Sequence, residues 1–137
     1  MQSEKRLMET VELENGLILH FYDLSKPITG GRYQVQLLVS MTVEIKQEYF
    51  NDFEDPLSAF NSFRKAKGKE IEFRQEKFRN FIADVEMKVV LEKMKQEYLE
   101  ANRMYLGHAA FPKKYVMKVY REWQDEEAIR CAQEQAM

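Results

Sequence analysis

The feature that most constrains the fold is a regular alternation of apolar and polar residues between positions 33 and 45. Apolar side chains occupy every second position: Tyr33, Val35, Leu37, Val39, Met41, Val43 and Ile45. The positions between them are polar except for Leu38. Because successive side chains of a β-strand point to opposite faces, this pattern predicts one long strand with a buried face and a solvated face. Such half-solvated strands are typical of antiparallel sheets.

Two shorter alternating runs, residues 11–14 and 17–22, precede this strand and are separated by Asn15-Gly16. Asn-Gly between alternating runs is a strong hairpin signal, typical of a type I′ turn with positive φ at both central residues. We therefore expect an antiparallel hairpin. A loop over residues 23–32 then leads into the long strand.

The second half of the chain is mainly helical in period. Asp55-Pro56 predicts the N-cap and first residue of a helix that ends at Gly68. Residues 69–74 alternate again and predict a fourth strand, with Phe78 as its furthest extension.

Two further helices are expected, one from about Ala83 to Gly107 and one from Phe111-Pro112 onward. The first has a wide apolar surface made of two stripes. The stripes are Met87, Leu91, Met94, Tyr98, Ala101 and Tyr105, and beside them Phe78, Ile82, Val85 and Val89. We expect Leu91, Met94 and Tyr98 to pack on the apolar face of the sheet, with Trp123 holding the last helix against it.

The element order β-β-β-α-β-α-α predicts an α+β fold, with an antiparallel sheet of about four strands covered by the C-terminal helices. A length of 137 residues suits a single domain over 1–137. Within it, residues 7–82 are β-rich and residues 83–130 are helical. The tail, residues 131–137, is expected to fray.

Composition indicates the compartment in which the protein is expected. One cysteine, Cys131, excludes an intrachain disulfide framework and suits a reducing compartment. No apolar run reaches the ~18 residues of a membrane span, and no secretory signal is evident at the start. We therefore expect a cytoplasmic protein without a membrane partner.

The small net charge of -2 hides four charged segments. Residues 61–79 and 113–121 each have four more cations than anions, whereas residues 44–55 and 122–134 each have four more anions than cations. Segregated charge of this kind steers partners more than it stabilises a fold. The candidate ligand-binding residues are nine cations: Arg64, Lys65, Lys67, Lys69, Arg74, Lys77, Arg79, Lys113 and Lys114.

No catalytic or metal-binding constellation stands out, and no cofactor is expected. His20 and His108 lie 88 positions apart with no carboxylate at ligand spacing. We expect His108 to help cap the preceding helix. Cys131 has acidic neighbours and no histidine near it in the sequence, which does not suit a nucleophile. Gly30-Gly31 leads into a strand and lacks a phosphate-loop motif.

The triplet Asp23-Leu24-Ser25 resembles part of the second motif of PilZ domains, which bind cyclic di-GMP. In that motif a glycine comes three residues after the serine, whereas Gly30 comes five residues after Ser25. The arginine motif of the family is also absent. We do not assign the chain to this family.

Three function hypotheses follow. The first is a non-catalytic interaction or oligomerisation module that binds itself or another protein. The second is nucleic-acid or phosphate-ligand binding through the basic-aromatic segment 60–79, although a sequence pI near 5.8 is low for a dedicated nucleic-acid binder. The third is a small enzyme that uses His20 or His108.

Overall fold

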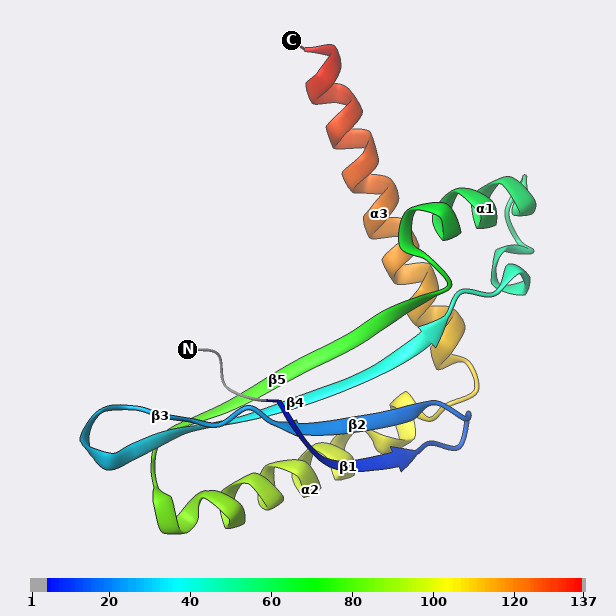
Figure 1. Cartoon of the computed structure of the whole chain (residues 1–137). Helices are drawn as coiled ribbons and strands as arrows, with labels where there is room; N and C mark the ends of the chain where they lie inside the picture. Colours follow the sequence, from blue (N-terminus) through cyan, green and yellow to red (C-terminus); the bar gives the residue numbers. More distant parts are fainter. Residues whose placement is uncertain (1–4, 137) are drawn as a thin grey trace. The chain divides into compact units, whose positions relative to one another are not determined.

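The computed structural model describes residues 5–136 and has an antiparallel sheet of five strands with three α-helices, which confirms the predicted α+β class (Figure 1). The strands are β1 (Arg6–Glu12), β2 (Ile18–Asp23), β3 (Lys26–Pro27), β4 (Arg32–Glu44) and β5 (Glu70–Ala83). The helices are α1 (Pro56–Lys67), α2 (Met87–Leu106) and α3 (Phe111–Gln135). Short 3-10 turns are η1 (Thr29–Gly31), η2 (Gln47–Phe50) and η3 (Asp84–Glu86). The two-residue strand β3 is the one strand that the sequence pattern missed.

The described chain divides into two compact units. The first comprises the residues up to Thr42 together with Glu72–Ala109, and it contains most of the sheet and α2. The second comprises Val43–Ile71 and the residues from Ala110 onward, with η2, α1 and α3. That the whole chain unfolds as a single domain stays a prediction.

In the first unit, β4 is the central strand and has the predicted register. Of the seven apolar positions, Tyr33 is half-buried and the other six are buried. Leu38, which the alternation places on the other face, is also fully buried. Within the sheet it lies opposite Tyr22 of β2, and β5 flanks β4 along its other edge.

The β1–β2 hairpin is confirmed, but its turn differs from the predicted type I′. The Leu13 N–H donates to Leu17 O at 2.8 Å, and the Gly16 N–H donates to Leu13 O at 2.9 Å. Among the described non-glycine residues only Phe81 has positive φ, whereas Gly16 has φ 89°. The loop therefore has three residues, and only its last residue needs the left-handed conformation.

Helix α2 packs along one face of the sheet in the first unit (Figure 1). Leu91, Met94 and Tyr98 are buried, as predicted, and the Tyr98 ring meets Phe21 edge-on at 6.0 Å between centroids. Tyr98 Oη also donates to Gln75 Oε1 of β5 at 2.7 Å. Burial raises the pKa of Tyr98 to about 12, because phenolate is poorly solvated there.

Lys95 is the one buried charged residue in the described chain. Its Nζ lies 2.6 Å from Glu9 Oε1 of β1 and 2.8 Å from Glu92 Oε1. Burial alone would lower the pKa of Lys95, but the hydrogen bonds to the two glutamates raise it overall. The ammonium therefore stays charged and ties α2 to the hairpin.

Strand β5 is longer than predicted and runs from Glu70 to Ala83. Phe78 and Ile82, which the sequence places on a helical stripe, belong to this strand, and α2 begins only at Met87. Val85 and Val89, also assigned to that stripe, are 88% and 71% exposed. Pairing with β4 overrides the local helical spacing, because strand formation depends on cross-strand neighbours more than on intrinsic preference.

The second unit has the predicted α1. Asp55 caps the helix by accepting a hydrogen bond from the Ser58 N–H at 3.2 Å, Pro56 opens the helix, and Gly68 ends it with φ 90°. Phe50, Phe60, Phe63 and Tyr120 form an aromatic core.

Trp123 joins this aromatic core, and its predicted role in holding the last helix against the sheet stays a prediction. Its ring contacts Phe63 of α1 at 5.5 Å and Tyr120 of α3 at 5.8 Å between centroids. Beyond Trp123, α3 is largely exposed up to Gln135. Fraying of the helix end stays a prediction.

Candidate functional site

Six of the nine candidate cations belong to the second unit. Arg64, Lys65 and Lys67 lie in the last turn of α1, where positive charge favours the helix dipole. Arg64 also lies over the Phe60 ring, 5.7 Å from its centroid. Lys69 precedes β5, and Lys113 and Lys114 lie in the first turn of α3. Lys113 Nζ pairs with Asp52 Oδ2 at 3.3 Å.

The other three candidate cations lie on β5 in the first unit. Arg74 forms ion pairs with the glutamates two positions before and after it on the strand, at 3.7 Å from Glu72 and 2.7 Å from Glu76. Lys77 and Arg79 instead line a hollow of about 310 Å³ beside Tyr98 and other residues of α2. The structure therefore brings Lys77 and Arg79 together and places Arg74 on the opposite face of the strand.

Contacts on each side fix the two faces of β5. Gln75 points toward α2, because it accepts the hydrogen bond from Tyr98 Oη. Asn80 points to the other face, where its Oδ1 accepts from Gln34 Nε2 of β4 at 3.0 Å. Odd-numbered residues from 75 to 79 thus face the helix, and even-numbered residues face away from it.

The outer edge of β5 is the feature of this unit best suited to bind a partner. Within residues 5–136, β5 pairs with β4 and with no strand on its other side. Residues 74–81 are all exposed. Such an edge presents a row of backbone N–H and C=O groups that can template a further strand. The edge also has charges of both signs, which makes pairing selective for one register.

Sequence reasoning missed this edge. The sequence alternation predicts a strand only to Arg74, with Phe78 as its furthest extension, and a sequence period does not tell whether a strand is central or at an edge. One signal was available: residues 70–80 have charged or polar side chains on both faces, which is how natural edge strands avoid indiscriminate pairing.

The two histidines lie apart from any metal-binding group. His20 stacks on Tyr22 with 6.1 Å between ring centroids, and His108 is placed after α2. The carbonyls that end α2 accept hydrogen bonds from the Asn15 side chain, at 2.8 Å from Leu106 O and 2.9 Å from His108 O. Among residues 5–136, no cluster of three or more His, Cys, Asp or Glu side chains could hold a metal ion.

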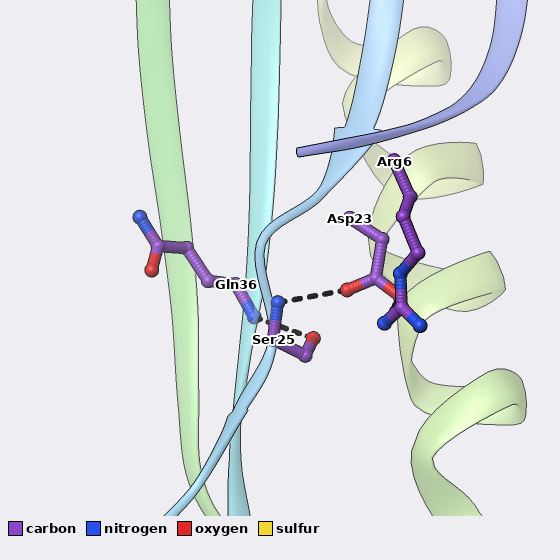
Figure 2. Close-up of polar contacts among 4 residues, drawn as sticks. All are labelled: Arg6, Asp23, Ser25 and Gln36. Atoms are coloured by element: carbon purple, nitrogen blue, oxygen red, sulfur yellow. Dashed lines mark hydrogen bonds and ion pairs between the residues drawn. The ribbon is translucent and has the colours of Figure 1, made fainter. Parts of the chain in front are cut away.

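The triplet Asp23-Leu24-Ser25 ends β2 and forms the link to β3, which continues alongside β4 (Figure 2). Asp23 Oδ1 accepts from the Ser25 N–H at 2.8 Å, and Asp23 Oδ2 accepts from Arg6 at 2.8 Å. Ser25 Oγ accepts from the Gln36 N–H of β4 at 3.1 Å. The side chains of Asp23 and Ser25 are thus engaged in holding this link against β4 and β1.

Cys131 lies exposed on α3 as a free thiol. Searched over the described residues, no helix has the length and apolar character needed to cross a membrane.

Comparisons with known proteins identify no relative. No family model matches the chain, and no curated protein or solved structure matches it either.

Proposed function

We propose that this chain is a non-catalytic interaction module that self-associates by pairing the outer edge of β5 with the same edge of a second copy. The observation that carries the proposal is the long exposed strand with one unfilled side in the described fold. Antiparallel pairing of two such edges satisfies the backbone groups of both copies around a two-fold axis.

Charge selects one register for this pairing. In an antiparallel pair, side chains directly opposite each other lie on the same face of the sheet. A two-fold axis perpendicular to the sheet therefore places even-numbered residues of β5 opposite even-numbered residues of the second copy, and odd-numbered opposite odd-numbered. An axis at Gln75 places Arg74 opposite Glu76 of the second copy, and Glu76 opposite Arg74. Axes at positions 74, 76 and 77 would instead oppose Arg74, Glu76 or Lys77 to itself, and an axis at Phe73 would oppose Glu70 to Glu76.

The backbone hydrogen bonds contribute most of the attraction, and the charges decide the alignment. Opposite charges across a strand pair contribute roughly 0.2–1 kcal/mol each, and like charges destabilise by similar amounts. Changing both symmetric Arg74–Glu76 pairs from opposite to like charge should therefore weaken the dimer by about 1–4 kcal/mol, roughly fivefold to several hundredfold in Kd.

Sedimentation equilibrium of a charge-swap series tests the proposal. Arg74→Glu and Glu76→Arg should each weaken self-association, and the double variant R74E/E76R should restore it, because the swap re-creates the opposite-charge pairs. Arg79→Glu is the matched control, since it changes net charge as Arg74→Glu does but faces no charged residue in this register. A wild-type chain that is monomeric at its highest soluble concentration, or a double variant as weak as R74E, contradicts the proposal.

The setting of this module is proposed to be the cytoplasm, where the exposed thiol of Cys131 would stay reduced. Nucleic-acid or phosphate-ligand binding through segment 60–79 remains the alternative. Arg74 and Lys113 already have carboxylate partners within the chain, which reduces the charge available to a phosphate. A salt-dependent binding titration separates the two functions, because phosphate neutralisation gives a steep dependence on salt.

A further inference from the structure

The second unit has a hollow of about 560 Å³ between α1 with its preceding turn and α3. Its aromatic part consists of Phe53, Tyr120 and Trp123, with centroids 5.2 Å apart for Phe53 and Tyr120 and 5.8 Å apart for Tyr120 and Trp123. Phe53 and Trp123 are half-buried, so parts of their rings remain open to a ligand. Ser58 and Ser62, one helical turn apart on α1, form a low wall.

The hollow has an acidic rim. Asp55 and Glu127 line it, and none of the residues that line it is a cation. Arg130 neutralises part of the charge of Glu127, at 2.7 Å, but also pairs with Glu134 at 3.0 Å. Asp55 and Glu127 belong to the two acidic segments of the sequence, residues 44–55 and 122–134, each with five anions and one cation. Both acidic segments lie within this one unit.

We propose that this hollow binds arginine or lysine side chains of a basic segment in a partner protein. Aromatic faces attract cations, most strongly at tryptophan, and carboxylates at the rim add charge-assisted hydrogen bonds. The two carboxylates that line the hollow disfavour anionic ligands there and favour the entry of a basic side chain. This site is independent of strand pairing at β5, since it lies in the other unit and uses none of its residues.

The fluorescence of Trp123, the chain's only tryptophan, reports directly on this site. The probe is an N-acetylated, C-amidated octapeptide of alternating arginine and glycine, and its control has citrulline in place of each arginine. The arginine peptide should change the Trp123 emission in a saturable manner, and the neutral citrulline peptide should not. No change in emission at millimolar arginine peptide, or equal changes with both peptides, overturns the proposal.

Two charge-matched double variants test the role of the rim. The site variant is Asp55→Asn with Glu127→Gln. Asparagine caps a helix about as well as aspartate, so α1 keeps its start. The control variant, Glu54→Gln with Glu126→Gln, removes the same charge from neighbouring exposed positions that do not line the hollow.

The site variant should bind the arginine peptide at least about fivefold more weakly than the control variant, because it loses the carboxylates in direct contact. Equal weakening in the two variants would mean that only diffuse negative charge attracts the peptide, and the assigned site would be wrong. Circular dichroism of both variants verifies that helix content is unchanged.

Discussion

The Asn15 side chain makes three hydrogen bonds, two that connect the β1–β2 turn to the C-terminal end of α2 and one within the turn itself. Its Nδ2 donates to Leu106 O at 2.8 Å and to His108 O at 2.9 Å, and its Oδ1 accepts from the Leu17 N–H at 3.0 Å. Asn15→Asp keeps the shape of the side chain and its Oδ1 acceptor, but it replaces the Nδ2 amide group, which donates two hydrogen bonds, with an oxygen. We expect this single change to destabilise the first unit strongly.

The magnitude follows from those contacts. Two lost hydrogen bonds cost about 0.5–1.5 kcal/mol each, and a carboxylate beside the negative end of a helix costs a further ~0.3–1 kcal/mol. The expected loss at neutral pH is therefore about 1.5–4 kcal/mol. Asn15→Ala loses three hydrogen bonds and should cost a similar amount, about 1.5–4.5 kcal/mol, without adding a charge.

The pH dependence distinguishes the two variants. The folded state disfavours the new carboxylate, so its folded pKa lies above its unfolded value of about 3.9. Its charge penalty is then absent below the unfolded pKa and grows as pH rises toward the folded pKa. Urea unfolding followed by circular dichroism should show a deficit relative to wild type that shrinks from pH 7 to pH 4 for Asn15→Asp alone. A wild-type midpoint for Asn15→Asp, or deficits of both variants that are independent of pH, would refute the reasoning.

Three further predictions concern the core, the buried phenol and the basic residues. Leu37→Ala should lower the free energy of unfolding by roughly 2–5 kcal/mol, because Leu37 is fully buried in β4; a loss below 1 kcal/mol, by urea titration, contradicts the packing. Tyr98 should ionise near pH 12 in the folded protein but near pH 10 in the unfolded chain. The free energy of unfolding of the wild type should therefore fall as pH rises from 10 to 12; an equal fall in Tyr98→Phe contradicts this. The last prediction concerns four lysines, Lys65, Lys67, Lys113 and Lys114. If the chain binds nucleic acid through them, their reversal to glutamate should abolish binding and its salt dependence; unchanged binding in a filter assay excludes them as the site.

Much of the fold could be predicted because the local patterns agree with the tertiary contacts. The β4 alternation, the Asp55-Pro56 start of α1 and the glycine end of that helix each act through neighbouring residues. The type I′ turn was wrong because Asn-Gly fits two turn geometries, and the contact of Asn15 with α2 favours the three-residue loop. That contact joins residues 91 positions apart, which no local pattern indicates.

The surfaces were harder to predict than the elements. Phe78 and Ile82 fit a helical stripe by spacing, but pairing with β4 makes them part of β5. The basic segment was correctly identified as charged, yet a charge count cannot tell that Arg74 pairs with Glu76 or that Arg79 faces α2. The hollow beside Trp123 arises from two helices that are separated by more than 40 positions, so only the fold brings its residues together.

Electron–electron distance measurement between spin labels on β5 tests the central proposal most directly. Labels are attached to cysteines replacing Phe78 or Asn80 in a Cys131→Ser background, two positions on the same face of the strand. With a rise of about 3.4 Å per residue and strands ~5 Å apart, an axis at Gln75 predicts Cα separations of about 21 Å for position 78 and about 34 Å for position 80. An intermolecular distance that is about 13–14 Å longer at position 80 than at position 78 supports antiparallel pairing at this edge. Absence of any intermolecular distance, or equal distances at both positions, would contradict it.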